Sequence, residues 1–294
     1  MLTVAFLGLG SIGRPMARRI KEAGFPLTVW NRTGDRAVAF AKEIGAKQAN
    51  SASDAARAAD VVVTCLSTSL DVEQVVESGL IDGLQSGATL LDCTSGDPAT
   101  SKRIAKRLKE KKIAFVDAPV SGGVKGANEG TLTVMCGGDA GDVDRVRPVI
   151  EAFGKKFVHC GPVGSGDAVK AMNQALLALT IWGTGEALVA LAKSGVSPAV
   201  ALEVINASSG RSNASINLFP ERVLTRAFPR TFRLALLDKD ARIAAQIARD
   251  ERVPAPLTQL VADLCTMARQ ELGEEADHVE AVQVIERWAG AQIK

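Results

Sequence analysis

Short apolar runs and amphipathic stretches of helical period alternate along the first 160 residues. Runs rich in β-branched residues are typical of strands buried on both faces of a parallel sheet. The strongest lie at 2–7, 25–30, 60–66, 88–95 and 113–117, and shorter ones at 47–49, 132–136 and 156–160. Because helical patterns separate them, the sequence predicts an α/β fold with a doubly wound sheet.

The pattern changes after residue 161, where helical periodicity replaces strand runs. Residues 168–194 form one long stretch rich in alanine and leucine, which is typical of a buried helix or a subunit interface. We therefore predict two domains, 1–162 and 163–294, the second all helical and connected through this long interdomain helix. Its further helices are expected near 198–207, 238–252, 255–272 and 278–289.

Three glycines follow the first strand in a G-x-G-x-x-G pattern, after which a helix begins. In a Rossmann-type unit such glycines allow a tight turn, the approach of a diphosphate and close packing of helix on strand. An ordinary structural turn is the alternative, but the second strand at 25–30 supplies the expected context. We predict that a dinucleotide binds Gly8, Leu9, Gly10, Ser11, Ile12 and Gly13.

The end of the second strand distinguishes the two dinucleotides. An NAD site usually has an acid there, which accepts hydrogen bonds from the ribose 2′-hydroxyl, whereas a 2′-phosphate favours an arginine. Here the residues are Asn31, Arg32 and Thr33, and the nearest acid, Asp35, is expected in the first turn of the next helix. NADP(H) is therefore the preferred cofactor, with NAD(H) possible.

Polar residues follow the later strands at the edge where ligands bind in such a sheet. Leu66, Ser67, Asp71 and Ser95 are candidates for contact with the cofactor, although Thr94 and Ser95 could instead cap the helix that begins near Pro98. The segment Ser121, Gly122 and Gly123 is expected to be a strand-end loop whose N–H groups hold a carboxylate, a simple turn being the alternative.

One polar group stands out near the start of the long apolar helix. Lys170, Asn173 and Gln174 occupy positions i, i+3 and i+4, so their side chains share one helix face. A lysine at a helix surface is the ordinary alternative. The two neighbouring amides beside the domain boundary favour a functional site formed by Lys170, Asn173 and Gln174, with Gln174 among the residues expected to contact the substrate.

Composition restricts the function further. The formal net charge is +2, which gives no argument for nucleic acid, and the basic residues between 102 and 112 fit the exposed face of a helix. The five cysteines are widely spaced and the two histidines are too few for a histidine metal site, so we expect no metal. We count no apolar run long enough to span a membrane, and expect a cytoplasmic homodimer or homotetramer acting on a small molecule.

Taken together, these motifs resemble the β-hydroxyacid dehydrogenase family, which includes 3-hydroxyisobutyrate dehydrogenase, tartronate semialdehyde reductase and the glyoxylate and succinic semialdehyde reductases. The resemblance covers the full length through the Gly8–Gly13 turn, the Asp117–Gly123 segment, Gly164–Lys170 with Asn173, and Lys239–Asp240. Ser67 and Asp71 depart from it, since many members have proline and asparagine there.

The resemblance implies that Lys170 is the catalytic residue, that Ser121, Gly122, Gly123 and Asn173 hold the substrate, and that Lys239 reaches the cofactor. It implies reversible hydride transfer between a small β-hydroxy acid and its semialdehyde or oxo acid. Two alternatives are an imine reductase on the same architecture, disfavoured by the presence of Lys170, and a non-catalytic NADP(H) sensor. The 6-phosphogluconate dehydrogenases share the early motifs but are longer.

Overall fold

The computed structural model describes residues 1–293, which fold as two compact units. The first comprises Met1–Lys170 and the second begins at Ala171. The division falls within helix α9 (Ser165–Lys193), a few residues beyond the domain boundary expected from the sequence, which stays a prediction.

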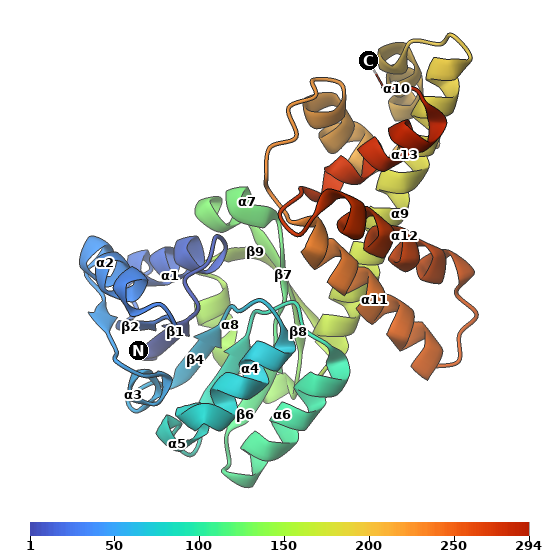
Figure 1. The fold of residues 1–294 in the computed structure, drawn as a ribbon. Helices are drawn as coiled ribbons and strands as arrows, with labels where there is room; N and C mark the ends of the chain where they lie inside the picture. Colours follow the sequence, from blue (N-terminus) through green and yellow to red (C-terminus); the bar gives the residue numbers. More distant parts are fainter. Residues whose placement is uncertain (294) are drawn as a thin grey trace. The chain divides into compact units, whose positions relative to one another are not determined.

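The first unit is built on a nine-stranded sheet in the order β3-β2-β1-β4-β5-β6-β8-β7, with β9 paired to β8 (Figure 1). Neighbours from β3 to β6 run parallel, β8 is antiparallel to β6 and β7, and β9 is parallel to β8. The strand order reverses at β1, the point where such sheets bind ligands. The strands are β1 Val4–Leu7, β2 Leu27–Trp30, β3 Lys47–Gln48, β4 Val61–Thr64, β5 Thr89–Asp92, β6 Ala114–Asp117, β7 Val120–Ser121, β8 Leu132–Gly137 and β9 Gly154–Gly161.

Helices cover both faces of this sheet, which explains why its central strands are apolar throughout. Phe6 and Val63 lie in the core on one face, with residues of α1, α2, α7 and α8. Leu7 and Val62 lie in the core on the other face, with residues of α3, α4, α5, α6 and the π-helical turn η1. These helices are α1 Gly13–Glu22, α2 Gly34–Ile44, α3 Ala52–Ala56, α4 Ser69–Val75, η1 Val76–Leu80, α5 Ile81–Gly83, α6 Pro98–Glu110, α7 Gly123–Glu129 and α8 Ala140–Ile150.

The second unit is helical. Ala178, Ile181 and Leu188 of α9 lie in its main core. By length and composition α9 could cross a membrane, with 29 residues and an 18-residue window of mean hydropathy 1.7, so the expectation that no apolar run reaches that length was wrong. The core helix of a soluble protein meets the same criterion, and part of α9 lies in the core of this unit. The other helices are α10 Pro198–Ala207, η2 Ala214–Val223, α11 Leu234–Asp250, α12 Pro256–Leu272, η3 His278–Ala281 and α13 Val282–Ala289.

The predicted doubly wound sheet followed by a helical region is confirmed. Three elements were missed, β7, α7 and η2. Glycines occupy both ends of α7, at Gly122 and Gly130, and η2 contains Pro220, so neither segment has an ordinary helical pattern in sequence.

Candidate active site

The turn between β1 and α1 has the form that a dinucleotide diphosphate needs. Gly8 has φ +101°, and a Cβ there would lie 2.3 Å from the carbonyl oxygen of Cys65. A Cβ on Gly13 would lie 2.0 Å from the carbonyl oxygen of Gly8, so helix and strand approach too closely for a side chain. At Gly10, by contrast, no described residue has an atom within 4 Å of that position. The two outer glycines pack the turn and the middle one leaves space, which fits the cofactor.

Asn31, at the end of β2, is bound to this turn. Its Oδ1 accepts a hydrogen bond from the N–H of Leu9 at 3.0 Å, and its Nδ2 donates to the carbonyl oxygen of Thr33 at 3.1 Å. Arg32 and Thr33 are exposed. The amide of Asn31 therefore fixes the turn, and the adjacent guanidinium is left at the surface, while Asp35 lies in the first turn of α2 as expected.

A buried acid organises the ends of β4 and β5. Asp92 is 1% exposed, and its Oδ1 accepts from the Thr64 hydroxyl at 2.8 Å and the Thr94 N–H at 3.0 Å. The Thr94 hydroxyl in turn accepts from the N–H of Leu66 at 3.0 Å. Helix α6 is capped by Asp97, so the alternative in which Thr94 or Ser95 caps it was wrong. In the sequence, the feature that could have pointed to Asp92 is its position as a single acid at the end of an apolar strand.

Asp71 has a local structural partner. Its carboxylate accepts from the N–H and hydroxyl of Thr68, whose own hydroxyl accepts from the N–H of Asp71, and together they form a capping box at the start of α4. Ser67 is exposed beside it and Ser95 is half-buried. Contact of Asp71, Ser67 and Ser95 with the cofactor stays a prediction.

The segment expected to hold the substrate carboxylate joins a strand to a helix. Ser121 ends β7, Gly122 has φ +133°, and Gly123 begins α7 with φ +62°. The expected loop is therefore the last residue of a short strand and the first turn of a helix. Both glycines are exposed and adopt conformations that residues with side chains rarely reach. Backbone N–H groups at such a turn can bind an anion.

Lys170 lies against this segment within the first unit. The side chain is buried, with 7% exposure, and its Nζ donates to the carbonyl oxygen of Val120 at 2.9 Å. Val120 directly precedes Ser121, so the ammonium and the candidate carboxylate site adjoin one strand. The structure thus places the Lys170 ammonium on the residue that precedes Ser121.

Three predicted site residues belong to the second unit. Asn173 follows in α9, is exposed, and donates through Nδ2 to Oε1 of the buried Gln174 at 3.3 Å. Lys239, in α11, pairs with Asp240 at 2.9 Å. Their roles stay predictions.

Two further buried acids, which sequence reasoning did not assign to the site, surround the start of α9. Asp117 accepts from the N–H of Gly164 at 2.7 Å through Oδ1 and from the N–H of Asp167 at 3.0 Å through Oδ2. Asp167 accepts from the N–H of Gly96 at 3.0 Å and from the Ser101 hydroxyl at 2.6 Å. Burial raises the pKa of both carboxyl groups, and the charges of Asp117 and Asp92 raise that of Asp167 further.

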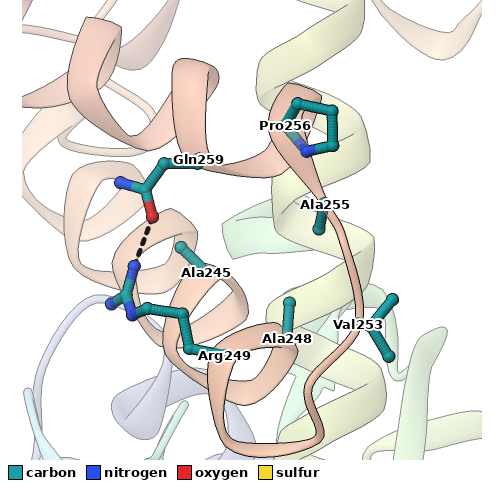
Figure 2. Close-up of a pocket in the computed structure, with 7 residues that line it drawn as sticks. All are labelled: Ala245, Ala248, Arg249, Val253, Ala255, Pro256 and Gln259. Carbon is teal, nitrogen blue, oxygen red and sulfur yellow. Dashed lines mark hydrogen bonds between the residues drawn. The ribbon is translucent and has the colours of Figure 1, made fainter.

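A separate pocket lies in the second unit, where the chain passes from α11 to α12. Figure 2 shows small apolar side chains lining it, among them Ala245, Ala248 and Pro256. Arg249 closes one side and donates to Gln259. The pocket contains none of the predicted site residues. Nor does any group of three or more histidine, cysteine, aspartate or glutamate side chains among residues 1–293 stand ready to hold a metal ion.

Two family models match this chain, one over each part of it. Residues 3–161 match the model of the NAD-binding domain of 6-phosphogluconate dehydrogenase, and residues 164–285 match that of the NAD-binding domain of NADP-dependent 3-hydroxyisobutyrate dehydrogenase. The chain belongs to the β-hydroxyacid dehydrogenase family. It is an NAD(P)-binding dehydrogenase, as the resemblance in sequence indicated.

Individual members of the family match over nearly their full length. The 2-(hydroxymethyl)glutarate dehydrogenase of Eubacterium barkeri is 32% identical over 99% of this chain and 97% of its own. The 3-hydroxyisobutyrate dehydrogenase of Pseudomonas aeruginosa is 34% identical over 95% of each chain. A structure of 3-hydroxyisobutyrate dehydrogenase from Mycobacterium tuberculosis with L-serine superposes with a TM-score of 0.90, at 29% identity, over 97% of this chain and 99% of that chain.

Proposed function

We propose that this dehydrogenase uses NADP(H) in preference to NAD(H) and interconverts a small β-hydroxy acid with its semialdehyde or oxo acid, with Lys170 as general acid and base. The observation that carries the proposal is the buried ammonium of Lys170 on the carbonyl oxygen of Val120, next to the Ser121–Gly123 segment. A carboxylate bound at that segment would keep the reacting carbon of a short acid near the ammonium.

The chemistry follows from the charge that develops during the reaction. The nicotinamide, when bound, supplies or accepts the hydride. Reduction of a carbonyl leaves negative charge on its oxygen, which Lys170 can stabilise and then protonate. In the oxidising direction the neutral amine accepts the hydroxyl proton. The amides of Asn173 and Gln174 would orient the substrate.

The preference for NADP(H) rests on the end of β2. Asn31 carries an amide, already bonded to Leu9 and Thr33, and so has no carboxylate for a ribose 2′-hydroxyl. The exposed Arg32 is available to a 2′-phosphate. A hydrogen bond to a charged group contributes about 1.5–3 kcal/mol, which is about ten- to a hundredfold in affinity. The ratio of kcat/KM for NADPH to that for NADH should fall by this factor in Arg32→Ala. Arg57→Ala, with its side chain 69% exposed and paired to Asp54, is a matched control.

The substrate class can be tested with a panel of short acids. We expect NADPH oxidation with one or more of glyoxylate, succinic semialdehyde, methylmalonate semialdehyde and tartronate semialdehyde, and test L-serine and 3-hydroxyisobutyrate in the oxidising direction. An aldehyde of equal length without a carboxylate should react poorly. Turnover of a cyclic imine alone would favour an imine reductase, and binding of NADPH with no turnover of any compound would favour a sensor.

The role of Lys170 has its own test. General acid–base catalysis contributes about 10²–10⁴-fold, so Lys170→Ala should lose at least that much kcat while still folding and binding NADPH. Lys170→Arg should recover little, because a guanidinium hardly releases a proton. A kcat of Lys170→Ala within tenfold of wild type would contradict the mechanism.

The cytoplasmic location and the homodimeric or homotetrameric assembly expected from the sequence stay predictions.

A further inference from the structure

The start of helix α9 is held by two carboxylates that the mechanism above does not use. Asp117 ends β6 and accepts from the N–H groups of Gly164 and Asp167, one with each oxygen. Asp167 lies in the first turn of α9 and is bound to Gly96 and Ser101 on the segment around the start of α6. Both are almost completely buried, with 0% and 1% exposure.

Glycines give these carboxylates the space they occupy. A Cβ on Gly137, which pairs with Asp117 in the sheet, would lie 2.6 Å from both of its carboxylate oxygens. A Cβ on Gly166 would lie 2.8 Å from Asp117 Oδ2, and one on Gly96 would lie 3.0 Å from Asp167 Oδ2. Gly166 therefore has a packing role here, because it lets the backbone at the start of α9 close over the carboxylate of Asp117.

The Asp117 side chain is connected both to the Ser121–Gly123 segment and to the helix turn that precedes Lys170. Asp117 begins the segment that leads through Val120 to Ser121 and the two glycines. Its carboxylate binds the first turn of α9, and Lys170 lies one turn further and returns to the carbonyl oxygen of Val120. A shift of the α9 start relative to β6 would therefore move the ammonium relative to the candidate carboxylate site.

We propose that Asp117 and Asp167 are positioning residues for Lys170, and that their hydrogen bonds to Gly164, Asp167, Gly96 and Ser101 fix the first turn of α9 at the distance from β7 that proton transfer needs. This inference rests on the proposed function of Lys170. It gives a reason why these acids lie together in the interior, although burial and the charges of Asp117 and Asp92 raise the pKa of Asp167.

Substitutions at Asp167 provide the first test, because asparagine can keep the hydrogen bonds of this acid and alanine cannot. The Asn Oδ1 would accept from Gly96, and its Nδ2 would donate to Ser101, whose hydroxyl can reverse and accept. Asp167→Ala should lower kcat by about ten- to a hundredfold, and Asp167→Asn should restore most of this loss. Equal kcat in the two variants would overturn the role given to Asp167. Asp144→Asn, with its side chain 72% exposed, controls for loss of an acid.

At Asp117 the same replacement should fail. Both of its oxygens accept from N–H groups, so asparagine would set an NH₂ against one of these donors. We expect Asp117→Asn to lose about ten- to a hundredfold in kcat, with KM for NADPH within about twofold of wild type. If this variant does not fold, as judged by circular dichroism, the Asp167 pair decides the proposal.

A double-mutant cycle separates positioning from general support of the fold. If Asp117 acts through Lys170, its replacement should cost almost nothing further in kcat once Lys170 is alanine. An equal loss in the wild-type and Lys170→Ala backgrounds would overturn the proposal while leaving the proposed function intact. A Lys170→Ala enzyme as active as wild type would instead overturn the proposed function, and the positioning role with it.

Discussion

Asp277 in the helical unit and Asp92 in the sheet unit are both buried, yet the pKa of Asp277 is lowered and that of Asp92 is raised. Burial raises the pKa of Asp277, but the hydrogen bond and charge of His278 and the N–H groups of Phe232 and Thr231 outweigh it, so that the pKa ends well below its usual range. At Asp92 burial prevails over the hydrogen bonds from Thr94 and Thr64, the charge of Asp117 adds to it, and the pKa rises to about 6.

The difference lies in what surrounds each carboxylate. Asp277 Oδ1 lies 3.5 Å from Arg222 Nη1 and 3.0 Å from His278 Nδ1, and Oδ2 accepts from the Thr231 and Phe232 N–H groups at 2.7 and 3.0 Å. Asp92 has another acid nearby, and among the described residues its Oδ2 has no hydrogen-bond partner. Depth of burial alone therefore does not tell which aspartates stabilise the fold.

The largest expected effect is at Asp277. Asparagine there would lose the attraction to Arg222 and place an NH₂ against N–H donors, and breaking a buried ion pair costs about 3–5 kcal/mol. The free energy of unfolding of Asp277→Asn, measured with urea at pH 7, should fall by that amount. The exposed Asp144→Asn should change it by less than about 0.5 kcal/mol. A loss below about 1 kcal/mol at Asp277 would remove the contrast between the two regions.

At Asp92 the comparison becomes a pH dependence. An unfolded aspartate has a pKa of about 3.9, and the folded value is about 6, so between these values the folded protein binds the extra proton. The stability from this group is complete below about pH 4 and is lost as the pH rises through 6, a change on the order of 3 kcal/mol. At Asp277 the sign is reversed, because a lowered pKa gives stability that is lost as the pH falls.

The variant Asp92→Asn isolates the contribution of the Asp92 carboxyl group to stability. Its Oδ1 can still accept from Thr64 and Thr94, and the side chain cannot ionise. Unfolding free energies of wild type and Asp92→Asn, measured from pH 4.5 to 7.5, should therefore diverge as pH rises, with the variant gaining relative to wild type. Parallel curves would mean that Asp92 titrates normally.

The contrast also marks how far sequence reasoning reaches. Strand runs such as 60–66 and the Gly8–Gly13 turn are local patterns, and both formed as expected because periodicity and turn chemistry are written in neighbouring residues. Lys170 was proposed for the site because its polar neighbours share a helix face, and its role stays a prediction.

The acids were missed because their partners are distant in sequence. Asp117 meets Gly164 and Asp167 about 50 residues later, and nothing near Asp117 marks it as a ligand for helix N–H groups. Packing between elements therefore decided the partners of Asp117. Asp71 is a different case, because its partner Thr68 lies only three residues away, and its contact with the cofactor stays a prediction.

Glu286 offers an intermediate case in the helical unit. It is 4% exposed, receives two bonds from Arg226 at 2.6 and 2.9 Å, and accepts from the Ile293 N–H at 2.8 Å. Glutamine would keep one acceptor oxygen but lose the charge and one of the paired bonds. Hydrogen bonds to charged groups contribute about 1.5–3 kcal/mol, so Glu286→Gln should cost about 2 kcal/mol in urea unfolding. A loss of stability equal to that of Asp277→Asn would show that the partial exposure of Arg226 does not lower the energetic cost of removing its partner.

The smallest effect is expected at Asp71, a half-buried acid whose partner is a local cap. Asp71→Ala removes one side of the Thr68–Asp71 capping box, which typically costs about 1 kcal/mol of stability. If capping is its whole role, the dissociation constant for NADPH, measured by quenching of tryptophan fluorescence, should stay within about twofold of wild type. A tenfold weaker affinity would instead assign Asp71 to the cofactor site. Thr68→Ala removes the other side of the box and separates the two cases, because it should cost similar stability and leave cofactor affinity unchanged under either reading.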